Sequence, residues 1–249
     1  AQLSQYAKEV KTEADQFAHL SLTDPLTALG NRRALSLNVE QWAHSASNNS
    51  VGSLLLIDID FFKQVNDRFG HAEGDRVLCE LSRGLLDSVR AQDTVARYGG
   101  EEFIILLHNL SPVQQVALQQ AELVAEKVRT ALNTPFKLEQ LSYVSSPSIG
   151  ITLFSDDNNS IDELLQQADL AMYQAKAAGK NMIKFFDVAM QVKASERTRL
   201  ESELREAIKR QQLQLYFQGL HDGQGKLLGA EVLLRWFHPE YGQISTEKF

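Results

Sequence analysis

Cysteine and long hydrophobic runs are nearly absent from this sequence. The single cysteine, Cys79, cannot form an internal disulfide, which suits a reducing compartment. Apolar neighbours at helical spacing predict that it is a buried helix thiol rather than a nucleophile. The longest uncharged apolar runs, at residues 53–57 and 103–107, are far too short to cross a bilayer, and no secretory signal pattern is recognised at the start. We therefore expect a cytoplasmic location.

Positive charge is also in short supply. The chain has 25 Lys and Arg against 32 Asp and Glu, giving a net charge of −7 at pH 7. Such a balance argues against a nucleic-acid polymer as partner, although a nucleotide can still bind where a few cations and a metal are placed locally. There is no GxxxxGK[ST] loop, no GxGxxG after a strand and no Cys/His zinc spacing, so three common classes of phosphate or metal site are not indicated.

Hydrophobic periodicity predicts one α/β domain over residues 21–187, with a sheet that mixes a hairpin with crossover helices. Ser111-Pro112 with Gln114, and Ser160 with Glu163, are predicted to be capped helix starts. The expected helices cover residues 32–46, 74–89, 111–132 and 160–178, and the expected strands cover residues 51–58, 94–98, 103–107, 146–154 and 182–186.

The two ends of the chain are predicted to lie outside this domain. Residues 1–20 carry an apolar stripe at helical spacing, which we interpret as the end of a signalling linker. Residues 188–249 contain a predicted helix at 194–209 and two strand-like runs, too few residues to bury a substantial core. Because the chain begins with Ala1 rather than Met, we expect it to be part of something longer.

Two groups of carboxylates stand out. Asp58 and Asp60 end a strand that is predicted to be central, and side chains at i and i+2 point to the same side of a strand. Glu101 and Glu102 follow Gly99-Gly100 in the predicted hairpin, where a substrate could approach the backbone closely. Carboxylates are ligands suited to Mg²⁺ bridging phosphates, so the pattern favours phosphoryl or nucleotidyl transfer. The alternatives are a solvated strand end and a decorative acidic hairpin.

The hairpin segment Arg97-Tyr98-Gly99-Gly100-Glu101-Glu102-Phe103 resembles the signature of the GGDEF family of diguanylate cyclases, in its GGEEF form. The supporting segments follow the order of that family: Asp24-Pro25-Leu26-Thr27, Asn31-Arg32-Arg33, Asp58-Ile59-Asp60-Phe61-Phe62-Lys63, Asn66-Asp67, Gly70-His71, Gly74-Asp75, Ala168-Asp169, Tyr173-Gln174-Ala175-Lys176 and Gly179-Lys180-Asn181. The resemblance implies an α/β (α+β) nucleotidyl-cyclase, palm-like domain with a central mixed five-stranded sheet flanked by helices.

The resemblance also implies roles at individual positions. Asp58 and Glu101, with the Ile59 carbonyl, match the ligands of a Mg²⁺ or Mn²⁺ ion, and Glu102 matches a residue that helps deprotonate the attacking 3′-hydroxyl. The positions that match substrate contacts are Asn66 and Asp75 for guanine, Lys63, Lys176 and Lys180 for phosphates, and Phe61, Phe62, Gly99 and Gly100 around them.

The activity implied is the condensation of two GTP molecules into cyclic di-GMP and two pyrophosphates, by a homodimer that forms at least transiently. Arg90 and Asp93 match the RxxD motif of an inhibitory site for the product, cyclic di-GMP. Residues 196–249 resemble the start of an EAL-type cyclic di-GMP phosphodiesterase, with Glu231 at its first metal ligand and its other acidic ligands expected beyond Phe249. Membrane contact is expected only through regions absent from this chain, as in a membrane-anchored bacterial signalling protein.

Two other classes of function compete with a cyclase. One is a catalytically silent sensor that binds GTP or cyclic di-GMP and controls an EAL module. The other is a scaffold that dimerises through the stripe in residues 1–20. The intact acidic turn, together with matching guanine and phosphate positions, favours the enzyme.

Overall fold

The computed structural model describes residues 22–45, 51–138, 141–155 and 160–246, and the predicted helix at residues 1–20 lies outside them. The chain divides into two compact units between Asp187 and Val188. No helix among the described residues is long and apolar enough to cross a membrane.

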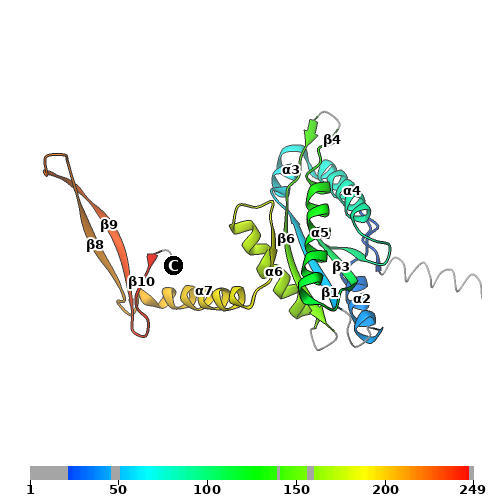
Figure 1. Ribbon diagram of the computed structural model, residues 1–249. Coiled ribbons are helices and arrows are strands. Elements are labelled where there is room, and N and C mark those ends of the chain that lie inside the picture. The colour runs from blue at the N-terminus through cyan, green and yellow to red at the C-terminus, as the bar shows by residue number, and fades with distance from the viewer. Residues whose placement is uncertain (1–21, 46–50, 139–140, 156–159, 247–249) are drawn as a thin grey trace, which may run out of the picture. The chain divides into compact units, whose positions relative to one another are not determined.

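The first unit is built on a five-stranded mixed sheet with the strand order β2-β3-β1-β6-β7 (Figure 1). β1 is central and pairs antiparallel with β3 and β6, β2 pairs antiparallel with β3, and only β6 and β7 are parallel. The predicted fold class is therefore confirmed. The bounds are β1 Val51–Ile59, β2 Thr94–Gly99, β3 Glu102–Leu110, β6 Pro147–Ser155 and β7 Ile183–Phe185, with a separate ribbon of β4 Phe136–Leu138 and β5 Leu141–Tyr143.

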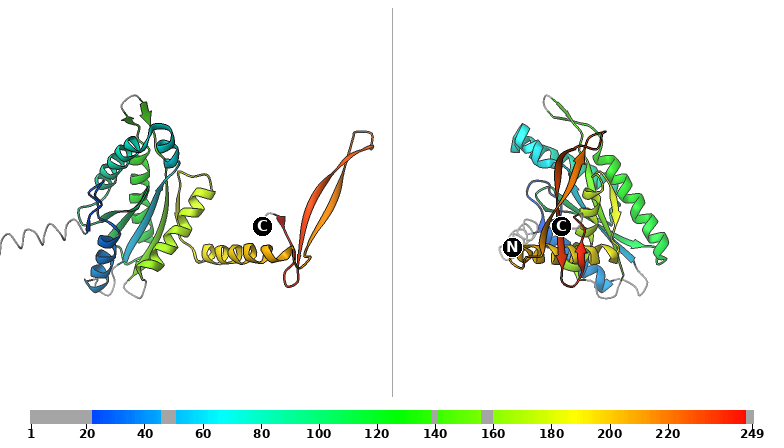
Figure 2. Two further views of the ribbon diagram at one scale, coloured as in Figure 1. Left: turned by 180° about the vertical axis from the view of Figure 1, so that it is seen from behind. Right: turned by 90° about the vertical axis from the view of Figure 1, so that its left-hand side faces the viewer.

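Helices cover both faces of this sheet. Alternate side chains of β1 explain why, because Leu55 and Ile57 join one buried cluster while Leu54 and Leu56 join the other. The first cluster takes in side chains of α4 and α5, and the second takes in side chains of α2 and α6. Figure 1 shows α5 in front of the sheet, and Figure 2 shows the same unit from behind. The helix bounds are α2 Arg32–Ser45, α3 Phe62–Phe69, α4 His71–Ser88, α5 Gln114–Leu132 and α6 Ile161–Ala177.

Local sequence patterns predict one helix start correctly and another incorrectly. The capping box at Ser160 is confirmed, since the Ser160 hydroxyl accepts from the Glu163 N–H and the Glu163 carboxylate accepts from the Ser160 N–H. The predicted capping box at Ser111 is wrong: α5 begins later, at Gln114. The Ser111 hydroxyl accepts from the N–H of Val113, and the Ser111 N–H donates to the side chain of Gln120 instead.

The second unit, Val188–Phe249, has little interior of its own. It consists of α7 Val188–Ala207 and a three-stranded antiparallel sheet of β8 Leu213–His221, β9 Leu227–His238 and β10 Gly242–Ile244. Ala207, Trp236 and Ile244 form its small buried cluster, and most side chains of β8 and β9 are exposed. The expected shortage of core in this segment is observed.

Candidate active site

The acidic residues of the hairpin lie beside the end of the central strand. Asp58 on β1 is directly opposite Glu102 on β3, and the N–H of Ile59 donates to the Glu101 carbonyl at 3.4 Å. Asp58 is 8% exposed, whereas Glu101 and Glu102 are half-buried. Strand pairing thus brings together the three carboxylates that the sequence predicts to act together, although they come from separate segments.

A cation from α6 lies within this acidic group. The ammonium of Lys176 forms an ion pair with Asp58, with Nζ 2.8 Å from Oδ2. A second lysine, Lys180, lies over the ring of Phe61 at 3.6 Å from its centroid. Two of the three lysines that the resemblance assigns to phosphates, Lys176 and Lys180, are therefore held against protein groups in this structure.

Glu102 has an environment that disfavours its ionised form. Burial, then the neighbouring charge of Asp58, raises the pKa of Glu102, while Lys176 partly opposes the rise. A raised pKa is the property expected of a residue that exchanges a proton near neutral pH.

Glu102→Gln is expected to stabilise the metal-free protein at pH 7.5 and to have little effect near pH 4. The folded chain binds the Glu102 proton more tightly than the unfolded chain does, so ionisation costs stability as pH rises above the ordinary glutamate pKa. Since solvent screens a partly exposed group, we expect a gain below about 1 kcal/mol. Thermal unfolding at both pH values measures it, and an equal shift at both would contradict the assignment.

Asp60 has a structural role rather than a place among these carboxylates. It is 3% exposed and accepts from the Ser148 hydroxyl at 2.8 Å, the Ser146 hydroxyl at 3.1 Å and the Asn181 N–H at 3.0 Å. The spacing rule that places Asp58 and Asp60 on the same side of a strand does not extend to Asp60, because β1 ends at Ile59 and the Asp60 N–H donates to the Ser146 carbonyl before β6. Asp60 therefore ties that loop to the segment that carries Lys180.

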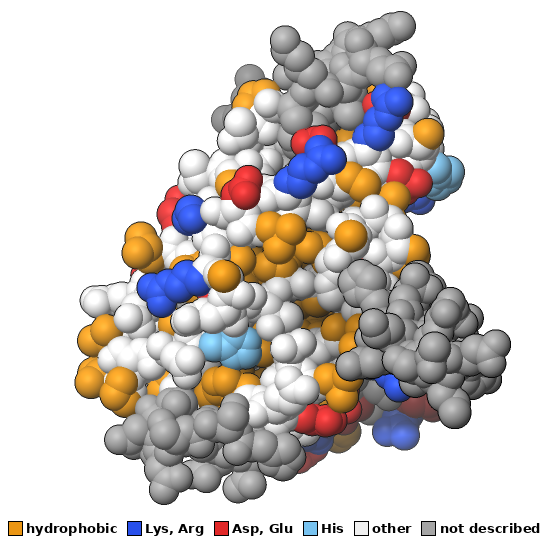
Figure 3. Space-filling view, turned by 90° about the vertical axis from the view of Figure 1, so that its right-hand side faces the viewer, with side chains coloured by type: hydrophobic (Ala, Val, Ile, Leu, Met, Phe, Trp, Pro, Cys, Tyr) orange, Lys and Arg blue, Asp and Glu red, His pale blue; other side chains and the backbone are white. Residues whose placement is uncertain are grey.

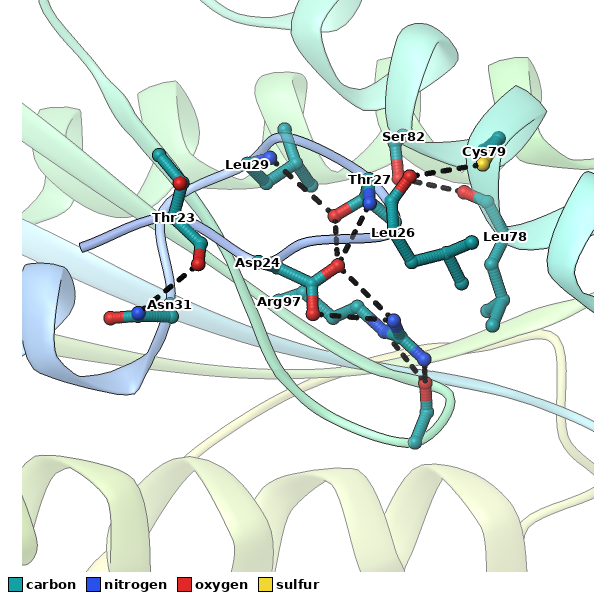
Figure 4. A network of polar contacts seen from close by, with 11 residues as sticks. Thr23, Asp24, Leu26, Thr27, Leu29, Asn31, Leu78, Cys79, Ser82 and Arg97 are labelled. Carbon is teal, nitrogen blue, oxygen red and sulfur yellow. Dashed lines mark hydrogen bonds and ion pairs between the residues drawn. The ribbon is translucent and has the colours of Figure 1, made fainter. Parts of the chain in front are cut away.

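The turn at residues 99–102 is anchored by a network that begins in the Asp24–Thr27 segment (Figure 4). Arg97 forms an ion pair with Asp24, with Nη1 3.1 Å from Oδ1, and donates to the Gly100 carbonyl at 2.8 and 3.0 Å. Burial alone would raise the pKa of Asp24, but hydrogen bonds from Thr27 and Arg97 outweigh it and hold the pKa below its ordinary value. The sequence pattern does not predict this contact between the two motifs.

For the nucleotidyl transfer that the sequence predicts, Arg97→Lys is expected to lower turnover about 10- to 100-fold, which is typical when a residue that orients a ligand is lost. The guanidinium of Arg97 donates to Asp24 through one nitrogen and to the Gly100 carbonyl through another. The single ammonium of a lysine cannot reproduce both contacts. Steady-state kinetics measure the loss, with Arg83→Lys, an exposed substitution on α4, as the matched control. Equal rates for the two variants would show that the network does not position the turn.

Asn66, one of the two predicted guanine-binding residues, lies where α3 and α4 approach, against the residue before Asp75. A Cβ added to Gly74 would lie 2.0 Å from Asn66 Oδ1 and 3.3 Å from Phe62 Cζ, so only glycine lets Asn66 lie against α4 beside Asp75. Phe61 is 51% exposed and Phe62 is buried, so of the two phenylalanines only Phe61 presents its ring to a ligand. The other predicted contacts, Lys63, Asp75, Gly99 and Gly100, are exposed.

The predicted metal ligands suit a hard divalent cation. No three His, Cys, Asp or Glu side chains converge to hold a metal ion in the described part of the chain. Mg²⁺ is commonly held by one or two carboxylates together with substrate phosphates, rather than by an all-protein cage. Asp58, Glu101 and the Ile59 carbonyl form a donor set of this kind, because the three lie where β1 and the hairpin turn meet.

Arg90 and Asp93 line a separate surface pocket of about 390 Å³, with Ser88, Val89, Leu123, Val124 and Lys127. The Arg90 N–H donates to Asp93 Oδ2 at 3.0 Å, and Asp93 Oδ1 accepts from the N–H of His108 at 3.2 Å. Figure 3, which views the α4 side of this unit, shows exposed hydrophobic side chains with basic ones nearby. The α5 residues of the pocket were not foreseen, because nothing local in the sequence marks them.

Comparison with known proteins identifies the family of this chain. The model of the family described as "Diguanylate cyclase, GGDEF domain" matches residues 21–182. The chain belongs to the GGDEF family. That family takes part in cyclic di-GMP signalling, and its match covers both the acidic hairpin and the Arg90–Asp93 pocket.

Relatives of this GGDEF chain include proteins with different stated activities. The bifunctional diguanylate cyclase/cyclic di-GMP phosphodiesterase MucR of Pseudomonas aeruginosa is 38% identical, over 94% of this chain and 34% of MucR. The cyclic di-GMP phosphodiesterase NbdA of the same species is 32% identical, over 93% of this chain and 30% of NbdA. The chain thus spans about a third of the length of these curated relatives.

A solved structure supports the fold of the GGDEF domain. The coiled coil and GGDEF domain of DgcB from Caulobacter crescentus, solved in complex with c-di-GMP, has a TM-score of 0.67 and 22% identity. The match covers 74% of this chain and 95% of DgcB's.

Proposed function

We propose that this chain is a metal-dependent diguanylate cyclase that condenses two GTP molecules into cyclic di-GMP and releases two pyrophosphates. The observation that carries the proposal is the register that sets Asp58 opposite Glu102, with Glu101 at the turn and Lys176 within reach. A silent nucleotide-binding module has no need of all four residues.

In the proposed reaction two domains meet about a two-fold axis, each with one GTP, and each 3′-hydroxyl attacks the α-phosphate of the opposite GTP. A bound Mg²⁺ or Mn²⁺ supplies charge neutralisation on the phosphates and helps to activate the hydroxyl. Asp58, Glu101 and the Ile59 carbonyl would hold that ion, and Glu102, directly opposite Asp58, is placed to take the hydroxyl proton.

The remaining residues bind and orient the substrate. Lys63, Lys176 and Lys180 bind phosphates. Lys180 supplies a positive charge but, unlike an arginine, cannot form two parallel hydrogen bonds to one phosphate. Asn66 and Asp75 read the guanine edge, since an amide and a carboxylate offer the acceptors and donor that this edge requires. Because each domain carries one half of the reaction, a homodimer is needed for product to form.

The proposal is tested by chromatography of nucleotides after incubation with GTP and Mg²⁺ over a wide range of protein concentration. We expect cyclic di-GMP, with a rate per chain that rises with protein concentration as dimers form. Bound product must be stripped beforehand. Hydrolysis of GTP to GDP without cyclic di-GMP would reject the proposed reaction.

We further propose that the Arg90–Asp93 pocket binds the product and slows the enzyme. Arg90 is exposed and can bind guanine or phosphate through two parallel hydrogen bonds, and Lys127 on the pocket wall adds positive charge. Burial lowers the pKa of His108, so this neighbour of Asp93 adds no charge at neutral pH.

Arg90→Ala is expected to raise the cyclic di-GMP concentration that halves activity by about tenfold or more, because loss of one charge-assisted contact costs about 1.5–3 kcal/mol. The initial rate without product should remain that of the parent. Progress curves with added product measure both quantities, and unchanged inhibition would remove this pocket from the account.

A sensor function is the second candidate, favoured by NbdA, a relative whose name gives phosphodiesterase activity alone. On this view the domain binds GTP or cyclic di-GMP and controls a neighbouring phosphodiesterase. We interpret residues 196–249 as the start of an EAL domain, with Glu231 as its first metal ligand.

A further inference from the structure

The ion pair between Lys176 and Asp58 occupies a carboxylate that the proposed function needs for another cation. Lys176 Nζ lies 2.8 Å from Asp58 Oδ2, and the side chains are 32% and 12% exposed, respectively. A carboxylate has several lone-pair sites, so the ammonium does not block coordination outright, but its positive charge at this distance opposes the binding of a divalent ion to the same carboxylate.

The surroundings of Lys176 are acidic. Its ammonium contacts Asp58, which lies directly opposite Glu102 on β3, the residue after Glu101. Lys180, the other lysine near the site, is held over the Phe61 ring instead. The two lysines therefore carry the same charge but differ in whether they contact Asp58.

We propose that Lys176 competes with the divalent metal for Asp58, so that the nucleotide-free protein binds metal weakly. The triphosphate of GTP provides stronger acceptors for the ammonium and draws Lys176 away from Asp58. Metal and nucleotide then bind with positive coupling, through a lysine that exchanges one anion for another. This inference rests on the proposed metal ligands and adds a role for Lys176 before substrate arrives.

The test measures Mn²⁺ binding to the nucleotide-free protein by electron paramagnetic resonance, a readout that needs no turnover. Lys176→Met is expected to bind Mn²⁺ about tenfold more tightly than the parent, because removal of a cation at contact distance frees Asp58. Lys180→Met is the matched control, since it removes the same charge without breaking the ion pair. We expect its affinity to change less than about twofold, because a more distant charge is screened.

A double-mutant cycle separates competition from a general charge effect. In the Asp58→Asn background, Lys176→Met should give no gain in Mn²⁺ affinity, because there is no carboxylate left to release. Equal gains from Lys176→Met and Lys180→Met, a full gain in the Asp58→Asn background, or no Mn²⁺ binding by any variant would each overturn the proposal.

The outcome is independent of the cyclase assay. If the parent forms cyclic di-GMP but Lys176→Met leaves Mn²⁺ affinity unchanged, the competition is refuted while the proposed function stands. If Lys176→Met tightens Mn²⁺ binding and the parent forms no product, the competition stands and the proposed function fails.

Discussion

Asp58→Asn is expected to reduce cyclic di-GMP formation about a thousandfold or more while leaving thermal stability almost unchanged. The asparagine keeps the shape of the side chain but loses the charge that holds a divalent cation. The lost ion pair with Lys176 is partly exposed and is worth about 1 kcal/mol at most. This loss is offset because the substitution also removes the negative charge of Asp58, which repels ionised Glu102. Product formation and thermal unfolding, measured on one preparation, check both parts.

Asp60→Asn, two residues further along, is the matched control and should show the opposite pattern. Its two carboxylate oxygens accept from Ser146, Ser148 and the Asn181 N–H. Asparagine replaces one of these oxygens with an amide nitrogen, which cannot accept a hydrogen bond. We expect a loss of about 2–3 kcal/mol of stability for buried groups left unsatisfied, with a smaller fall in turnover of the folded protein. If both variants lost activity to the same extent without loss of stability, the separation of roles would be refuted.

Gly150→Ala is expected to destabilise the first unit by about 3 kcal/mol or more, which lowers the melting temperature by on the order of 10 °C. Gly150 lies in β6 under α6, and an added Cβ would be 2.0 Å from the Ala168 carbonyl oxygen and 2.4 Å from the Met172 N–H nitrogen. Both atoms belong to the helix backbone, so relief requires α6 to move away from the sheet. The movement would also displace Lys176, which α6 carries.

Gly84→Ala is the control for Gly150→Ala. Gly84 lies inside α4, and an added Cβ would meet only Leu132 Cδ2, at an ordinary contact distance of 3.7 Å. Alanine is the better helix former, so a gain of about 0.5–1 kcal/mol is expected. Chemical denaturation of the two variants measures the difference, and a Gly150→Ala protein as stable as the parent would contradict the close packing of α6.

Most of the fold was predictable because its signals are local. The apolar run at β1, the hairpin of β2 and β3 and the capping box at Ser160 are each written within a few neighbouring residues. α3 was not predicted, because Phe61, the residue before it, has a left-handed φ of 62° and forms no side-chain cap. The start of α5 was misplaced because Gln120, a turn or two into the helix, competes with the local capping partner.

The site was predictable in its residue types but not in its pairings. The order of motifs singled out Asp58, Glu101 and Lys176, yet only the folded chain shows that Lys176 reaches Asp58. Arg97 and Asp24 are 73 positions apart, and Asp60 and Asn181 are 121 apart, so no spacing rule connects either pair. Such contacts depend on how strands and helices pack, which a linear pattern does not contain.

We propose that cyclisation of GTP depends on a metal held by Asp58 and Glu101. The most direct measurement is the yield of cyclic di-GMP and pyrophosphate from GTP and Mg²⁺, at high concentrations of the stripped parent chain and of Glu101→Gln. We expect the parent to form one cyclic di-GMP and two pyrophosphates for every two GTP consumed, and Glu101→Gln to form no detectable product. A parent chain that binds GTP or cyclic di-GMP but forms no product at any protein concentration would contradict it and favour the silent sensor.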